Sequence, residues 1–283
     1  MQTRESDLRR AAFGDDPGLG DRVLAAADGP RERWLAAVVL GARGRYAAAA
    51  SILQPLARGT DDVAAALAGS TLASHRRQLG GHAAAQPLDG AALARALGAT
   101  GTPDDDGLDP AGARADALLG LAADNLALGR LTASRRLIAA AAEHVTSWRT
   151  RVRAGWVSAE VALAGGGAAA AVPHAEQAAA CARQRGAVRH TVKSDLVLAA
   201  ALAATGEPVA RERAAALVTA ALEAARSYRL GSLGWPAGLL AADLEPRRAD
   251  QHRAWVTREL HALLPATDPE GRRLARASPW VPI

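Results

Sequence analysis

The chain has 283 residues, of which 74 are Ala and 36 are Leu, whereas aromatic residues make up only 3%. Ala and Leu lose little side-chain freedom in a helix, while strands favour β-branched and aromatic residues, so the composition indicates an all-α protein and excludes a large β-sheet. No stretch approaches the ~20 apolar residues of a membrane span, and the start, MQTRESDLRR, lacks the apolar core of a signal peptide. We expect a cytoplasmic protein with no membrane partner.

The formal net charge is +5, from 34 basic and 29 acidic side chains. Only Lys193 is a lysine, so the arginines account for the sequence pI near 10.4. A charge this small on a chain of this length is by itself no sign of nucleic-acid binding. The bias toward Arg and Ala resembles GC-rich coding of actinobacterial type. The single Cys181 excludes an internal disulfide and a multi-cysteine zinc site.

Turn signals divide the chain into helical segments typical of packed helices. Asp61 and Asp89 are suited to accept free amides at a helix N-terminus, and Pro30, Pro208 and Pro246 suit a first turn. The predicted helices, in chain order, are 18–27, 31–43, 45–57, 62–79, 89–98, 112–128, 131–144, 148–164, 168–185, 188–204, 208–229, 233–243 and 247–264. Glycines tolerate the left-handed residue that ends a helix, which predicts stops at Gly44, Gly80, Gly129, Gly165 to Gly167, Gly206 and Gly231.

The segment 99–112, ATGTPDDDGLDPAG, is the one convincing linker. Its prolines, aspartates and low apolar content predict an exposed, disordered acidic loop that does not pack into a core. The loop separates an N-terminal helical region, 1–98, from a helical array with a capping tail, 113–283. Because it lies between helices, we favour a loop within one superstructure, and two independent domains are the alternative. The aspartates lack the alternating ligands and the twelfth-position glutamate of a calcium loop.

A repeat is visible in the spacing of the helix-breaking glycines. Gly129, Gly166 and Gly206 fall 37 and 40 residues apart, each between two predicted helices. A large apolar residue lies two positions after the glycine, a small residue lies three positions later, and another apolar residue lies four positions beyond that. These residues are Tyr46, Ala49 and Leu53 after Gly44, and Leu131, Ser134 and Ile138 after Gly129. This spacing lays the small residue against the partner helix, so the two backbones approach closely.

The pattern resembles the tetratricopeptide repeat, a helix–turn–helix unit of about 34 residues, over residues 31–57 and 112–264. The matching positions are Leu118, Leu121 and Ala122 in a first helix and Gly44, Tyr46 and Ala49 in a turn and second helix. The later units are degenerate and longer. The resemblance implies an all-α, right-handed solenoid of stacked antiparallel helix pairs, whose first helices line a concave ligand-binding surface. A plain Ala-rich helical bundle is the alternative.

No catalytic constellation is recognisable in the sequence. No two of the seven histidines have the spacing of a helical metalloprotease, and alanines follow Gly167 where a phosphate-binding loop needs Lys and Ser/Thr. Cys181 lies among alanines with no identifiable histidine partner. We therefore expect a noncatalytic protein without a cofactor or metal. An enzyme with an inter-helix pocket, around Cys181 or His190, is the less favoured alternative.

The function implied by the resemblance is a scaffold that binds a protein or peptide in its concave groove. Asn125, Arg153 and Asp195 lie in the first helices and are therefore candidate contacts. Arg153 is the strongest candidate, because a planar guanidinium binds a carboxylate with two hydrogen bonds. Trp156 adds an aromatic wall one turn on. Trp280, in the terminal SPWVPI, either folds back with the tail as a cap or docks on a partner.

Arginine clusters support an RNA- or DNA-binding array as the alternative function. They are Arg149, Arg151 and Arg153; Arg183, Arg185 and Arg189; Arg211 and Arg213; and Arg226 and Arg229. Stacked helix pairs would align them into a basic stripe that suits a phosphate backbone or an acidic peptide. We slightly favour a solvated outer face, on which the arginines pair with glutamates. The sequence leaves the oligomeric state open.

Overall fold

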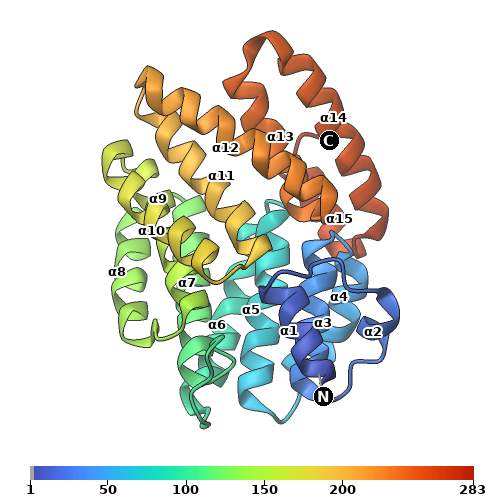
Figure 1. The fold of residues 1–283 in the computed structure, drawn as a ribbon. Coiled ribbons are helices and arrows are strands. Elements are labelled where there is room, and N and C mark those ends of the chain that lie inside the picture. Colours follow the sequence, from blue (N-terminus) through green and yellow to red (C-terminus); the bar gives the residue numbers. More distant parts are fainter. Residues whose placement is uncertain (1–2) are drawn as a thin grey trace.

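The computed structural model describes residues 3–283, which form helices joined by short loops and contain no strand (Figure 1). The first half holds α1 (Arg4–Phe13), α2 (Asp21–Ala25), α3 (Gly29–Ala42), α4 (Tyr46–Ala57), α5 (Asp62–Gln78), α6 (His82–Gly98) and α7 (Pro110–Ala127). The second half holds α8 (Leu131–Ala141), α9 (Trp148–Ala164), α10 (Ala168–Gln184), α11 (Val188–Ala204), α12 (Pro208–Ser227), α13 (Gly231–Leu244), α14 (Ala249–Leu263) and α15 (Pro269–Ala277). Within this described range, no helix has the length and apolar character needed to cross a membrane.

Most predicted helix ends agree with the structure, and two do not. The Asp61 side chain accepts the Ala64 amide at 3.0 Å, and Pro208 is the first residue of α12. Asp89 is not an N-cap: α6 begins seven residues earlier, and Asp89 is fully buried inside it. Gly231 is not a stop but the first residue of α13, and Arg229 adopts the left-handed φ of 54° in that turn. Neither α1 nor α15 was predicted from the sequence.

The other turn glycines do what the sequence predicts. The φ angles lie between 74° and 78° at Gly44, Gly80, Gly129, Gly166 and Gly206. L-residues rarely adopt this conformation, so glycine lets each first helix end and reverse into its partner.

Consecutive helices pack in pairs, and the pairs stack into a solenoid. Each first helix also contacts the next first helix, in the order α3, α5, α7, α9, α11, α13. The predicted small contact positions are confirmed as buried: Ala49 and Ser134 have no exposed surface, and the Ser134 hydroxyl donates to the Ala122 carbonyl of α7 at 2.8 Å. The chain is therefore an all-α helical solenoid whose first helices share one inner face.

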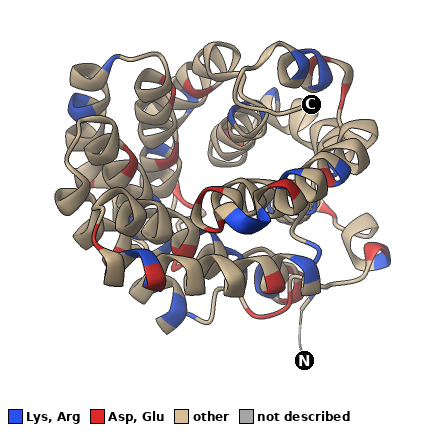
Figure 2. Ribbon diagram, turned by 90° about the horizontal axis from the view of Figure 1, so that it is seen from above, with Lys and Arg blue, Asp and Glu red and all other residues tan. Residues whose placement is uncertain are grey.

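The two ends of the solenoid meet, so the helices follow one another around a ring (Figure 2). At this seam α13 packs against α3, and the Ser232 hydroxyl donates to the Ala42 carbonyl at 2.9 Å. A Cβ at Gly231 would lie 3.0 Å from the Arg43 carbonyl oxygen, which shows how closely the backbones approach. The seam closes the ring of helices around the inner face.

A hydrophobic cluster and an ion pair join the C-terminal helices to the N-terminal half. Tyr46 and Leu79 share a buried core with Trp235, Leu260 and Leu263. On α5, Arg76 pairs with Asp268 at 2.8 Å, and α15 packs against that helix. The tail contributes Val281 to the cluster, while Trp280 stays 69% exposed. The tail thus folds back as a cap, but over the seam and not on the last helix pair alone.

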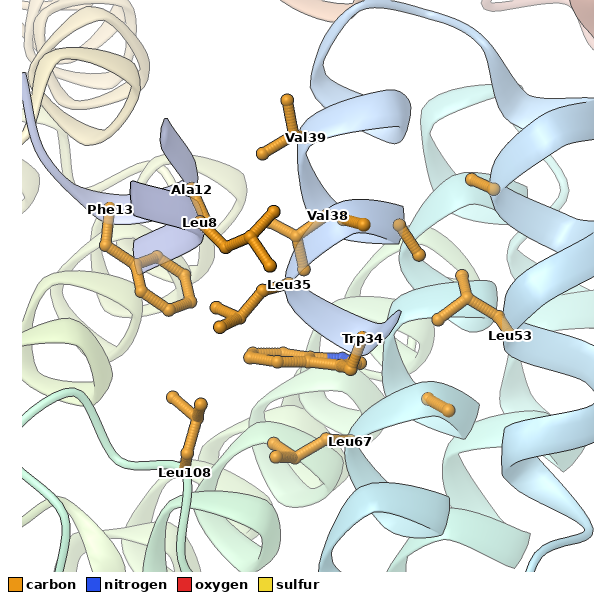
Figure 3. Packing of buried hydrophobic residues seen from close by; sticks show 14 of the residues in the cluster. Leu8, Ala12, Phe13, Trp34, Leu35, Val38, Val39, Leu53, Leu67 and Leu108 are labelled. Carbon is orange, nitrogen blue, oxygen red and sulfur yellow. The ribbon is translucent and has the colours of Figure 1, made fainter. Parts of the chain in front are cut away.

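The acidic segment 99–112 is only partly exposed: residues 100–103 and Asp105 are exposed as predicted, whereas residues 106–109 are buried against the core, contrary to the prediction. Leu108 is 2% exposed and lies in the same core as Trp34 (Figure 3). Arg9 of α1 pairs with Asp104 at 2.8 Å and with Asp106 at 2.6 Å, and the Trp148 indole donates to Asp106 at 2.8 Å. These partners offset the cost of enclosing the carboxylates. Helices α6 and α7 pack against each other across the loop.

Candidate functional site

The first helices line a cavity of about 630 Å³ on the inner face of the ring, and the cavity is open to solvent on one side. Its lining comes from α5, α7, α9, α11 and α13, with a contribution from α6. Most of the wall is apolar and includes Leu119, Leu126, Leu196, Leu239, Leu240 and Trp235. Cavities of this size and character are typical of ligand sites in proteins. We refer to it as the central cavity.

A second, smaller cavity of about 110 Å³ adjoins the central cavity. The two share lining residues: Ser74, Gln78, Arg153, Trp156, Arg189 and Ser232. The smaller cavity reaches inward toward Phe13 and Trp34, and its wall is more polar. It forms a deep polar extension of the central cavity, and we call it the inner pocket.

Two of the predicted binding residues, Arg153 and Trp156, line both cavities. Arg153 donates to Asp116 at 2.8 Å, and Arg149 donates to the other oxygen of the same carboxylate at 2.7 Å. Burial alone would raise the pKa of Asp116, but the two guanidiniums outweigh burial and hold this pKa below its usual range. The Trp156 indole donates to Ser194 at 2.8 Å. Both predicted side chains are therefore held in place at the cavity wall.

The structure does not bring the other three predicted residues into the cavity. The Asn125 amide donates to the Leu121 carbonyl of its own helix at 2.8 Å. Asp195 is buried between α10 and α11, where it pairs with Arg183. Trp280 lies in the terminal tail. Their contact with a partner stays a prediction, and it would require surfaces other than the central cavity.

A buried cation at the cavity wall is matched by carboxylates. Arg77 pairs with Asp89 and, at 3.2 Å, with Asp124. Burial of the Asp124 carboxyl, opposed by Arg77 and reinforced by Asp89, raises its pKa to about 6. Lys193 pairs with Glu160 at 3.1 Å. These groups give the wall polar character with little net charge.

Arg189 differs from every other cation of the site. Its Nε is buried without a hydrogen-bond partner, and within residues 3–283 no carboxylate pairs with its guanidinium. Burial, together with repulsion from Arg149 and Arg153, lowers its pKa to about 10. In the sequence, Arg189 is distinguished only as a member of an arginine cluster. Its inward direction depends on where α11 begins, at Val188, and on how that helix packs.

Two buried histidines complete the inner pocket. His75 is 5% exposed and His190 is 2% exposed, and the Nδ1 atom of each has no partner in the described part of the chain. Burial lowers the pKa of His75 to about 3, and burial lowers that of His190 well below its ordinary value. Both imidazoles are therefore neutral near pH 7. The Trp156 ring stacks on His190 with ring centres 5.7 Å apart.

Several arginines of the clusters predicted to form a basic stripe have partners on the outside of the ring. Arg213 pairs with Glu176 at 2.7 Å, and Arg211 donates to the Asp243 carbonyl at 2.8 Å. The guanidinium of Arg226 lies 4.8 Å from the centre of the Trp255 ring. Of the predicted stripe, only Arg149, Arg153 and Arg189 line the cavities. An extended basic track for a phosphate backbone does not follow from this arrangement.

No family model matches the sequence, and no curated protein matches it. Among solved structures, the fold is similar to a Signal Transduction ATPase with Numerous Domains protein with a tetratricopeptide repeat sensor from Pyrococcus horikoshii. The TM-score is 0.55 at 12% sequence identity, over 98% of this chain and 46% of that one. The chain thus spans about half the length of that protein. At this identity the likeness concerns the fold alone, a helical solenoid of the tetratricopeptide-repeat type.

Proposed function

We propose that the chain is a noncatalytic helical-repeat interaction domain that binds a segment of a protein, or a peptide, in the central cavity. The observation that carries this proposal is the lining: five successive first helices contribute to one cavity of about 630 Å³. In a repeat solenoid, the inner face collects equivalent positions from every unit, which suits an extended ligand.

The chemistry of the wall supports the same proposal. Leucines and Trp235 provide apolar surface, while Arg153, Lys193 and Glu160 provide charged groups at a few positions. Apolar surface with a few placed polar groups is the usual composition of a ligand site. The neighbouring solved structure carries its tetratricopeptide repeats as a sensor, which agrees with a binding role for this fold.

Filling the cavity tests the proposal. Ala200 is half-buried and lines the central cavity, so Ala200→Trp should occupy ligand space. Ala139→Trp, on the exposed face of α8, is the matched control. Peptides selected from a random library on the wild type should bind Ala200→Trp at least tenfold more weakly, about 1.4 kcal/mol, and Ala139→Trp unchanged.

Circular dichroism would verify that both variants keep the helical content of the wild type. If the selected peptides bind folded Ala200→Trp with wild-type affinity, the ligand surface lies outside the cavity. The proposal would then be wrong.

A further inference from the structure

The guanidinium of Arg189 is partly buried and pairs with no carboxylate of the described residues, an arrangement that is costly. A charged group that loses water needs a counter-charge or a full set of hydrogen bonds. Its Nε has neither solvent exposure nor a partner among the described residues. The other Lys and Arg side chains of the two cavities each form an ion pair with a carboxylate.

Charge around the inner pocket is unbalanced. Three guanidiniums, those of Arg149, Arg153 and Arg189, line it, and Asp116 is the carboxylate in its lining. Both oxygens of Asp116 are already used, one by Arg149 at 2.7 Å and one by Arg153 at 2.8 Å. The remaining excess of positive charge, centred on Arg189, is complementary to an anion.

The same pocket holds other unused hydrogen-bonding atoms. The Nδ1 atoms of His75 and His190 lack partners among the described residues, and both histidines line the pocket that Arg189 also lines. A neutral imidazole has one donor and one acceptor nitrogen, so each ring has the capacity to donate to an oxygen. A volume of about 110 Å³ exceeds the ~30 Å³ of one water and is sufficient for a carboxylate.

The inner pocket opens into the central cavity, and this continuity restricts the ligand. An anionic head on Arg189 would pass Arg153 and Trp156, which line both cavities, and its body would lie among Leu196, Leu239 and other apolar side chains. A highly charged ligand, such as a polyphosphate or nucleic acid, does not suit these apolar walls. A single negative charge on an apolar body suits both parts.

We propose that the chain binds a small organic acid, with its carboxylate on Arg189 in the inner pocket and its apolar body in the central cavity. The proposal rests on the proposed function only in placing a ligand in the central cavity. It names a different ligand, a small molecule, and it assigns Arg189 as the residue that selects for negative charge.

Calorimetric titration with four probes separates the contribution of the carboxylate head from that of the apolar body of the ligand. Octanoate carries both, acetate carries the head alone, octanol the body alone, and octylamine the body with the opposite charge. We expect octanoate to bind at least tenfold more tightly than each of the other three. Equal affinity for octanol and octanoate would overturn the proposal, because Arg189 would then play no part in selection.

Substitution of Arg189 tests the assigned residue. Arg189→Met and Arg189→Gln should each weaken octanoate binding at least tenfold. Arg189→Met should also raise the melting temperature of the ligand-free protein, because it removes a partly buried charge that has no carboxylate partner among the described residues. Arg213→Met is the control, since Arg213 is an exposed arginine paired with Glu176 on the outside of the ring. It should leave octanoate affinity unchanged.

The outcomes distinguish this proposal from the proposed function. If octanoate does not bind the wild type, or binds both folded Arg189 variants as tightly as the wild type, the organic-acid site is wrong. Selected peptides that still lose affinity on Ala200→Trp would in that case leave the interaction domain standing. If the Arg189 variants lose octanoate binding and peptide binding is unaffected by Ala200→Trp, the organic-acid site is supported and the proposed peptide site is wrong.

Discussion

Replacing Asp116 by Asn should destabilise the protein, because it removes the carboxylate that balances the positive charge of the inner pocket. The Asp116 side chain is 3% exposed, and it pairs with Arg149, at 7%, and Arg153, at 19%. Asn keeps the shape and one acceptor oxygen but removes the negative charge. Three guanidiniums would then face the pocket without a carboxylate.

The magnitude follows from the burial of these groups. Removing one partner of a buried ion pair costs about 3–5 kcal/mol, whereas an exposed pair contributes about 0–1 kcal/mol. Arg149 is enclosed, but Arg153 borders the central cavity and is partly screened by solvent. We therefore expect Asp116→Asn to lower the free energy of unfolding by about 3 kcal/mol, at the lower end of the buried range.

Urea unfolding followed by circular dichroism measures this loss, and a double-mutant cycle with Arg189→Met identifies its source. Without Arg189 one of the three repelling cations is absent, so Asp116→Asn should cost about 1 kcal/mol less in that background. Arg213→Met provides a background in which the cost should not change. A loss below about 1 kcal/mol in the wild type would show that solvent screens the cluster, and the reasoning about Arg189 would fail with it.

Three further predictions concern stability. Because the pKa of His75 is lowered to about 3, below pH 6.5 the unfolded chain binds a proton that the folded chain does not, and the folded state should lose stability as the pH is lowered. Between pH 7 and pH 5 this histidine should lower the free energy of unfolding by about 2 kcal/mol, and urea unfolding at the two pH values should show that His75→Gln lacks this part of the loss. Gly112→Ala should strongly destabilise the chain, because the new Cβ would lie 2.0 Å from a backbone oxygen. Gly90→Ala, whose Cβ meets nothing within 4 Å, should raise the free energy of unfolding by about 0.5–1 kcal/mol. Equal melting temperatures for the two variants would contradict this contrast. Ala49→Leu should cost about 1–3 kcal/mol by overpacking a position with no exposed surface, and an unchanged melting temperature would mean that the α3–α4 contact is looser than described.

The local features of the fold were predictable from the sequence because their causes are local. Asp61 caps a helix through an amide three residues away, and glycines such as Gly44 and Gly129 reverse the chain through their own φ angles. Two terminal helices were nevertheless missed. The α15 helix has a sequence signature, since Asp268 caps it and Pro269 opens it, whereas α1 is mostly polar and buries Leu8 and its neighbours only in the assembled core.

Closure of the ring around the site was not predictable, because contacts between distant residues produce it. Ser232 bonds to a carbonyl 190 positions earlier, and Arg76 pairs with a carboxylate 192 positions later. Asp89 has the sequence context of an N-cap, yet it pairs with Arg77 inside a helix. Arg153 and Trp156 were identified from their place on a first helix, and both line the cavities, whereas Asn125 and Asp195, chosen in the same way, do not. Place on a first helix therefore indicates the inner face only in part, and contact of these residues with a partner stays a prediction.

The arginines of this chain differ in environment in a way that their spacing does not reveal. Sequence gives their number and spacing, and these features are the same for an arginine that faces solvent and for one that faces a cavity. Arg213 finds a glutamate on the outside, while Arg189 finds no carboxylate within the described chain. The difference between an ordinary surface charge and a candidate ligand contact therefore appears only with the packing of α11.

The central cavity depends on the seam, because packing between the two ends of the solenoid closes the ring of helices around the inner face. Small-angle X-ray scattering from the monomeric chain in dilute solution tests the seam directly. A closed ring predicts the radius of gyration of a compact 283-residue protein, about 19 Å, and a single symmetric peak in the distribution of interatomic distances. A clearly larger radius, with a distance distribution that extends into a long tail, would show an open solenoid and contradict the closed ring.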